Sequence, residues 1–457
     1  MIAQWIEAGL AAASTDECVV IVRDTTEANL RWAINTLTTN GQMHHRSATV
    51  VAIRRVEGTG HAGVVSGPVA SEQDVVDLVA QACFAAATAP ASDDSAPLPE
   101  PVVDPDYAEG PIPTSIDVFA AFAQGLGRAL DASRQAGTEM FGYAEHHSST
   151  VWLATSAGAR RRAVERWGKV ELNAKHADRI GSAWVGRSTI DFTDVDADAL
   201  AAEVTRRLRW CENRIELPAG RYETILPPSA VADLMILTYW SASGRDAEQG
   251  RTVFAGRRPG TTRVGESLSG LPLTLSSGPG VLPAAPFAVV EGSVPGLASV
   301  YDNGAPAETV SWLRDGTLAA LPYTRAGAAA SGAEYAFPSE NLVLDAGSSA
   351  TLDELVRSTT RGLLLTCLWY IREVDIASLL VTGLTRDGVY LIENGEIVGM
   401  VNNFRFNESP VDLLRRAVEA SATEPTLCRE WNDWFTFTSM PALRIPDFTM
   451  STVSKAY

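Results

Sequence analysis

The spacing of hydrophobic positions predicts that residues 1–84 form a small α/β unit. Apolar residues three and four positions apart indicate helices, and short β-branched runs between turn formers indicate strands. Ser71 and Asp74 form a capping-box pair at the start of one helix, and Gly41 is suited to end another. The expected helices span 2–13, 27–41 and 71–86, and the expected strands span 18–25 and 47–58.

The pattern changes twice further along the chain. Residues 85–114 are rich in proline, small residues and acids, which predicts a linker or a long surface loop. Residues 115–215 predict a middle α+β domain, in which a helix ending at Gly137 and a helix over 196–213 frame antiparallel strands over 140–175 and 179–189. Residues 216–457 predict a large, mostly-β C-terminal domain, with helices that begin at Ser229 and at Ser409–Pro410. The expected fold class is therefore α+β.

Charge and composition narrow the class of function. Acids outnumber basic residues 55 to 37, a net charge of −18, which disfavours binding to nucleic-acid phosphates or to anionic membranes. The five cysteines are scattered without a CxxC pair, which suits a reducing compartment. The start carries Glu7 and no basic region typical of a signal peptide, and the apolar run 362–371 has about half of the ~20 residues that span a bilayer. We expect a cytoplasmic protein.

Motif searches find no self-evident catalytic site. None of the six histidines has another histidine three to five positions further on. Glu145, His146 and His147 come nearest to a cluster of metal ligands. Adjacent strand residues point to opposite faces, so His146 and His147 would not bind one ion together. We interpret them as a polar strand end. The sequence contains no GxSxG elbow and no P-loop, and Cys367 lies in an apolar run typical of a buried thiol.

The C-terminal third nevertheless resembles a known family. Its signature-like stretches are "TGLTRDGVYLIENGEI" (382–397) and "NNFRFNES" (402–409), within the segment 362–410. These stretches are similar to the TldD/PmbA (TldE) family of modulators and metalloproteases. Further similar stretches follow in the same order along almost the whole chain, at 30–41, 151–158, 217–235, 246–256 and 300–318.

The signature stretches also have a direct physical interpretation. Asn394–Gly395 is typical of a type I′ turn, and it would place Ile392 opposite Ile397 and Leu391 opposite Val398. In the second stretch, Arg405 and Asn407 alternate with Phe404 and Phe406. This alternation fits the lining of a groove or interface, and it equally fits an ordinary amphipathic edge strand.

The resemblance implies a division of labour. TldD-like members carry an HExxxH helix and a distant cysteine that bind zinc, whereas PmbA/TldE-like members lack the motif and pair with the first kind. The corresponding helix here, 229–250, contains no histidine, and 237–242 reads Leu-Thr-Tyr-Trp-Ser-Ala, which cannot ligate zinc. We therefore expect no catalytic or metal-binding residue in this chain, and zinc only in a TldD-like partner.

What the resemblance implies is the non-catalytic subunit of a heteromeric TldD/TldE-type zinc metalloprotease that acts on peptides or unfolded polypeptides, with possible homo-oligomers when the chain is alone. The residues expected to contact substrate or partner are Arg386, Asp387, Glu393, Arg405 and Asn407. Two alternatives stay open. One is a stand-alone hydrolase with an atypical site using Glu145, His146, His147 or Cys367, and the other is a homo-oligomeric scaffold that binds peptides.

Overall fold

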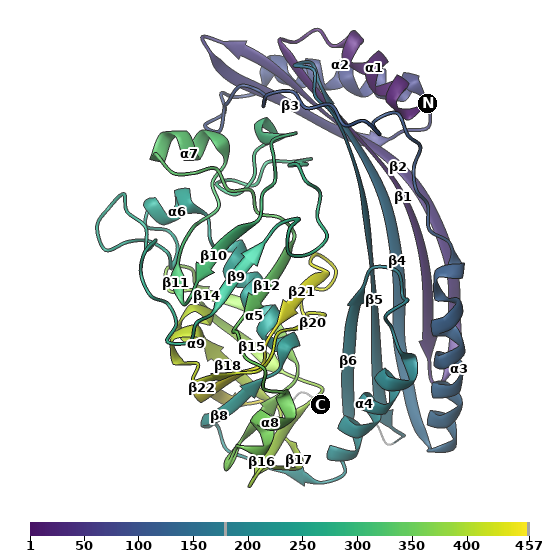
Figure 1. Ribbon diagram of the computed structural model, residues 1–457, viewed down its shortest axis with the longest axis vertical. Coiled ribbons are helices and arrows are strands. Elements are labelled where there is room, and N and C mark those ends of the chain that lie inside the picture. Colours follow the sequence, from purple (N-terminus) through teal and green to yellow (C-terminus); the bar gives the residue numbers. More distant parts are fainter. Residues whose placement is uncertain (178–180, 455–457) are drawn as a thin grey trace.

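A long, curved antiparallel sheet forms one side of the molecule, and the C-terminal half packs against its inner face (Figure 1). The computed structural model describes residues 1–177 and 181–454. The order of the six strands in the curved sheet is β3-β2-β1-β4-β5-β6. Their bounds are β1 (Glu17–Ala33), β2 (Thr36–Val56), β3 (Thr59–Pro68), β4 (Thr138–Thr155), β5 (Arg160–His176) and β6 (Ser182–Thr189). Positions 179–180 of the last predicted strand lie outside the described residues.

The predicted helix over 27–41 is wrong, because this segment forms a β-hairpin. β1 continues to Ala33, and Ile34 and Asn35 make the turn with positive φ values of 50° and 58°. Leu30 and Trp32 obey the period of two and are buried, whereas Ile34 and Leu37, which the helix would have buried, are 53% and 48% exposed. Strand pairing on both sides of β1 thus outweighs the local helical spacing.

Helices cover the outer face of the curved sheet. α1 (Ile2–Ala12) and α2 (Glu72–Thr88) pack on one end, and η1 (Ile116–Phe119), α3 (Ala120–Gln135) and α4 (Ala197–Trp210) pack at the other. The capping box of Ser71 and Asp74 is confirmed, and Gly137 ends α3 with a φ of +69°. The even-numbered residues of β1 face these helices. Its odd-numbered residues therefore face the C-terminal half.

The segment 85–114 joins two halves of one sheet. Residues 1–84 and 115–215, which we expected as separate units, each supply three of its strands. The connection is held against the sheet by hydrogen bonds from Trp152 Nε1 to the Tyr107 carbonyl (3.1 Å) and from the Ile112 amide to Thr150 Oγ1 (3.0 Å). It is therefore a long surface loop rather than a free tether.

The C-terminal half contains two further sheets. The first, ten-stranded, comprises β14 (Leu368–Asp375), β15 (Leu380–Thr385), β18 (Phe404–Glu408), β22 (Leu443–Val453), β8 (Gly220–Leu226), β13 (Arg361–Leu365), β16 (Val389–Glu393), β17 (Glu396–Val401) and β7 (Arg214–Ile215) in that order, with β19 (Glu419–Ala420) on β22. The second comprises β11 (Thr317–Leu318), β10 (Val310–Arg314), β9 (Thr274–Ser277), β12 (Asn341–Asp345), β21 (Phe437–Met440) and β20 (Glu424–Thr426). The helical segments are α5 (Pro228–Trp240), α6 (Gly244–Glu248), η2 (Val300–Asp302), α7 (Arg325–Ser331), α8 (Leu352–Arg357) and α9 (Pro410–Arg416).

The predicted hairpin between β16 and β17 forms with one change in register. Asn394 and Gly395 have φ values of 51° and 83°, as a type I′ turn requires, and Ile392 pairs with Ile397 as predicted. Leu391 pairs with Gly399 instead of Val398. A β-bulge between Leu391 and Ile392 causes this shift, because it places one extra residue in the opposite strand.

The fold is α+β, as expected from the sequence. Within the described residues, every helix is too short or too polar to cross a lipid bilayer. The curved sheet and the C-terminal half share an apolar contact, in which Val19, Ile21 and Leu153 meet Phe287 and Tyr301. This contact holds one end of the two layers together. Further along, the inner face carries polar residues that include Glu27, His147 and Lys169.

Asp302 lies at this contact and makes stability depend on pH. It is buried in η2, and its carboxylate accepts hydrogen bonds from the Arg325 amide at 3.3 and 3.4 Å. Burial raises the pKa of Asp302 to about 7. The folded state therefore binds a proton more tightly than the unfolded state, so the free energy of unfolding falls as pH rises from about 4 to about 7.

We expect the variant Asp302→Asn to remove this dependence. Its stability relative to wild type should rise by on the order of 2 kcal/mol between pH 4.5 and pH 8, measured by guanidinium unfolding at both values. Asp315→Asn, at an exposed turn, is the control and should follow wild type. Parallel pH profiles of wild type and Asp302→Asn would contradict the assignment.

Candidate functional site

Helix α5 is the segment in which the resemblance places zinc ligands. All but its last residue are buried, so it is a core helix with no solvent-facing side. It has no His, Cys or Glu, and Asp233 is its only carboxylate. Asp233 Oδ1 accepts hydrogen bonds from the Arg429 and Glu430 amides at 3.0 and 2.8 Å. Burial raises the pKa of Asp233 well above its usual range. A single carboxyl that already accepts two backbone hydrogen bonds does not make a zinc site.

The loop 427–435 connects α5 to the curved sheet. Trp431 Nε1 donates to the Asp233 carbonyl at 2.9 Å, which fixes the loop on the helix. From the sheet, Lys169 Nζ on β5 donates to Asn432 Oδ1 and to Asp433 Oδ1, both at 2.8 Å. Cys428 is buried beside them, and its Sγ donates to the Phe435 carbonyl at 3.1 Å. The loop 427–435 therefore connects α5 to the inner face of the curved sheet.

Arg429 occupies the boundary between the two layers. Its guanidinium lies 4.6 Å from the Trp369 ring and 5.4 Å from the Trp184 ring, and it is 3.4 Å from Glu171 of β5. In the described part of the chain, its Nε is buried without a hydrogen-bond partner. Arg429 thus joins a tryptophan of each layer and a carboxylate of the sheet in one polar contact.

Two of the predicted contact residues lie at this same boundary. Arg386 stacks over Trp369 at 6.0 Å, and its Nε lies 3.9 Å from Asp387 Oδ2. Asp387 accepts a short hydrogen bond from Ser182 of β6, in the curved sheet. Arg386 and Asp387 are therefore brought together with Arg429 between the layers.

The other three predicted residues lie elsewhere. Glu393 is at the tip of the β16–β17 hairpin, 3.6 Å from Arg361. Arg405 is exposed on β18 and donates to Thr382 Oγ1 at 3.3 Å. Asn407, two residues further on, lines a separate cavity of 490 Å³ between β18, β22 and α9. Nothing in the structure tests a role in contact with a substrate or partner for any of the five residues.

The cavity beside Asn407 is rich in charged groups that already pair with each other. Arg416 contacts Glu408, Asp412 and Asp447 at once. Arg415 contacts Asp412 as well. These charged side chains thus form one network of ion pairs around α9, and they are not free to bind another charged group.

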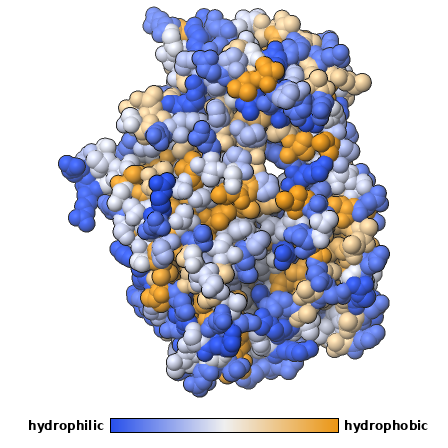
Figure 2. Space-filling model, in the orientation of Figure 1, coloured by the Kyte–Doolittle hydropathy of each residue, from blue (hydrophilic) through white to orange (hydrophobic). Residues whose placement is uncertain are grey.

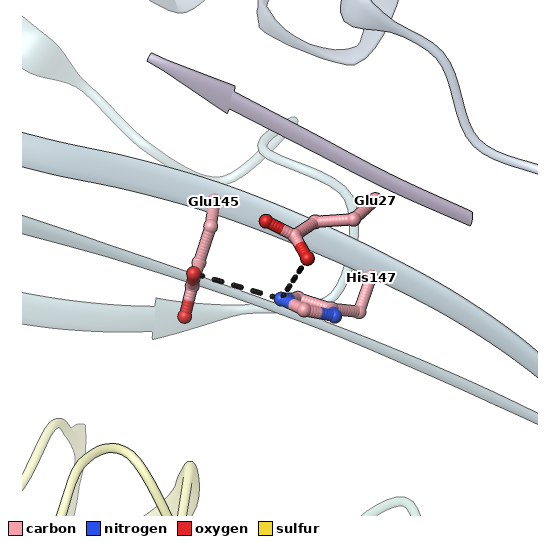
Figure 3. A group of neighbouring side chains, drawn as sticks. All are labelled: Glu27, Glu145 and His147. Carbon is pink, nitrogen blue, oxygen red and sulfur yellow. Dashed lines mark ion pairs between the residues drawn. The ribbon is translucent and has the colours of Figure 1, made fainter. Parts of the chain in front are cut away.

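A second polar group lies on the inner face of the curved sheet (Figure 3). Glu27 on β1 pairs in register with His147 on β4, and Glu145 is two residues before His147 on the same face. His147 Nε2 lies 3.6 Å from Glu145 Oε2 and 3.8 Å from Glu27 Oε2. Among the described residues, these three form the one group whose ligand atoms could surround a metal ion.

His146 points to the opposite face, as strand alternation predicted. Its Nδ1 lies 2.7 Å from Thr114 Oγ1, and its Nε2 lies 2.7 Å from the Ile190 carbonyl. Both ring nitrogens are therefore engaged in holding the segment around Thr114 and the end of β6. His146 is a structural side chain.

Sequence reasoning missed Glu27, Lys169, Asp233 and Arg429. The incorrect helix over 27–41 removed Glu27 from the sheet, so its register with His147 was not visible. Asp233 carried a usable signal, since a lone acid in a helix that is apolar all round indicates a buried carboxyl. Lys169 and Arg429 gave no such signal, because their roles depend on residues 264 and 258 positions away in the chain.

Cys367 does not have the surroundings of a nucleophile. It is fully buried, and burial raises the pKa of its thiol far above the usual value. A neutral, inaccessible thiol is inert. The atypical-hydrolase alternative therefore loses Cys367, and it retains only the group of Glu145 and His147.

Comparison with known proteins identifies the family. Residues 219–452, just over half of the chain, match the model of the PmbA/TldA metallopeptidase C-terminal domain. No curated protein matches the chain. Three solved structures share the fold over nearly their whole length.

TldE from Thermococcus kodakarensis has a TM-score of 0.78 at 16% identity, with 98% of this chain and 99% of that chain covered. A candidate modulator of DNA gyrase from Thermotoga maritima has a TM-score of 0.76 at 15% identity, covering 98% and 100%. A similar candidate from Bacteroides thetaiotaomicron has a TM-score of 0.74 at 14% identity, covering 99% and 98%. The domain match, supported by this shared fold, shows that the chain belongs to the PmbA/TldD metallopeptidase family.

Proposed function

We propose that this chain is the non-catalytic, TldE-like subunit of a heteromeric zinc metalloprotease that acts on peptides or unfolded polypeptides. The observation that carries the proposal is the chemistry of α5. A peptidase zinc needs three protein ligands around an open position, and α5 offers one carboxyl, which is already hydrogen-bonded. In this proposal, a TldD-like partner holds the zinc and this chain holds none at α5.

The arrangement around α5 supports a structural role in the assembly. Asp233 organises the loop 427–435 through two backbone hydrogen bonds. Two residues of that loop contact the curved sheet: Asn432 accepts a hydrogen bond from Lys169, and Arg429 forms an ion pair with Glu171. In this proposal, the helix that would bind zinc in a TldD-like protein here helps to hold the curved sheet against the C-terminal half. The two layers then offer a partner a surface of fixed shape.

An exposed sheet edge supports peptide binding. β14 is the terminal strand of the ten-stranded sheet, and four successive residues from Arg372 to Asp375 are exposed. An extended peptide can add to such an edge through main-chain hydrogen bonds. We infer that this edge guides peptide substrates toward the partner's zinc.

Purification from the native host tests the partnership. A tagged form of this chain should co-elute at fixed stoichiometry with a family member that carries HExxxH, and mass spectrometry should identify that protein. Elution as a homo-oligomer alone, at native expression levels of both proteins, would favour the peptide-binding scaffold and refute the heteromeric subunit.

A further inference from the structure

The group of Glu27, Glu145 and His147 has the spacing of metal ligands rather than of hydrogen-bonded side chains. The two distances from His147 Nε2 to the carboxylates, 3.6 and 3.8 Å, exceed the ~3.2 Å limit of a good N–H···O hydrogen bond. All three ligand atoms lie within 4.8 Å of one another. Two donors that each lie about 2.0–2.2 Å from one zinc ion are separated by up to about 4 Å. The two distances from His147 Nε2 to the carboxylates, 3.6 and 3.8 Å, fall within that span.

The imidazole nitrogen at the centre of the group has ion-pair contacts but, among the described residues, no hydrogen-bond partner. His147 Nε2 is buried and accepts or donates no hydrogen bond in the described part of the chain. Both glutamates beside it are buried, with 9% of Glu27 and 8% of Glu145 exposed. A bound cation would offset the cost of burying two carboxylates beside a nitrogen that has no hydrogen-bond partner.

Neighbouring side chains hold the three ligands in place. Asn29 Nδ2 donates to Glu27 Oε1 at 3.3 Å, and the Tyr143 hydroxyl donates to Glu145 Oε2 at 2.6 Å. The His147 ring is stacked on Trp167, with ring centroids 3.8 Å apart. Such outer contacts fix the orientation of ligands in metal sites.

Lys169 offsets part of the negative charge of the two glutamates, but its ammonium contacts the oxygen of Glu145 that does not face His147. Its Nζ lies 3.1 Å from Glu145 Oε1, on the side away from the oxygen nearest His147. Glu145 therefore keeps its other oxygen, Oε2, turned to His147. The same Lys169 pairs with Asp433, so the local excess of negative charge remains.

We propose that Glu27, Glu145 and His147 bind a divalent cation of the zinc class on the inner face of the curved sheet. One imidazole and two carboxylates favour Zn²⁺ or Mn²⁺ over Mg²⁺ and Ca²⁺, which prefer sites built from oxygen alone. The three residues lie on the face of the curved sheet that is turned toward the C-terminal half, and Figure 2 shows a hollow at the surface between these two parts. The site is separate from α5. For these three residues, the proposal departs from our expectation that the chain binds no metal.

Zinc binding by the full chain tests the site. After treatment with EDTA and buffer exchange, titration calorimetry with ZnCl₂ should show one site per wild-type chain. Glu27→Gln and His147→Gln should each weaken that binding at least tenfold. His45→Gln, which changes an exposed histidine of the same sheet, should bind zinc as wild type does.

Thermal unfolding provides a second readout that needs no activity. Zinc should raise the Tm of wild type and of His45→Gln by several degrees, and it should leave Glu27→Gln unchanged. Glu27→Gln preserves the shape of the side chain and its contact with Asn29, so its metal-free Tm should stay close to wild type. Failure of wild type to bind Zn²⁺ or Mn²⁺, or equal zinc binding by wild type and Glu27→Gln, would overturn the proposal. Neither result bears on the subunit role of the chain.

Discussion

Replacing Arg444 by methionine should destabilise the C-terminal half by about 3 kcal/mol, because a buried guanidinium that serves five acceptors is lost. Arg444 lies on β22 with 8% of its side chain exposed, and it forms ion pairs with Glu223 (2.7 Å) and Glu419 (2.8 Å). It also donates to the Leu355 carbonyl, Ser358 Oγ and Thr359 Oγ1, which ties the end of α8 to the sheet. Methionine fills the volume but leaves these acceptors unpaired.

The neighbouring strand offers a matched control. Among the described residues, Arg221 on β8 forms an ion pair only with Asp447, at 3.2 Å, and 67% of its side chain is exposed. Arg221→Met should therefore change the free energy of unfolding by less than about 1 kcal/mol. Guanidinium unfolding followed by tryptophan fluorescence measures both variants. A midpoint for Arg444→Met equal to that of Arg221→Met would show that the Arg444 network does not stabilise the fold.

Local signals in the sequence predicted most helices and many strands. Capping at Ser71, the turn at Asn394–Gly395 and the period of two in β4 and β5 each act over a few residues, so they are visible without the fold. The hairpin of β1 and β2 was missed because Leu30 and Leu37 satisfy a helical spacing as well. Only pairing with β4, more than 100 residues away, decides between the two structures.

The candidate sites could be predicted only in part. Strand alternation correctly separated His146 from His147, because it depends on neighbouring residues alone. The approach of Glu27 to His147 depends on the register of β1 and β4, which no local pattern specifies. The sequence itself shows that α5 has no His, Cys or Glu. The hydrogen bonds of Asp233 with the loop 427–435 are visible only in the fold.

Zinc-dependent peptide cleavage should be absent from this chain alone and present in its complex with a TldD-like partner. The physical reason is that α5 offers a single hydrogen-bonded carboxyl, Asp233, where a peptidase needs several zinc ligands and a general base. A cation bound by Glu27, Glu145 and His147 should not change this result, since both carboxylates of that site would serve as ligands and Lys169 holds the other oxygen of Glu145.

The most direct measurement compares hydrolysis of a mixed library of unstructured peptides by three samples: the purified chain with zinc, the HExxxH partner with zinc, and the reconstituted complex with and without EDTA. We expect cleavage by the complex that EDTA abolishes, and only background cleavage by the chain alone. Robust, EDTA-sensitive turnover by the chain alone, retained after removal of contaminating proteases, would contradict the non-catalytic role.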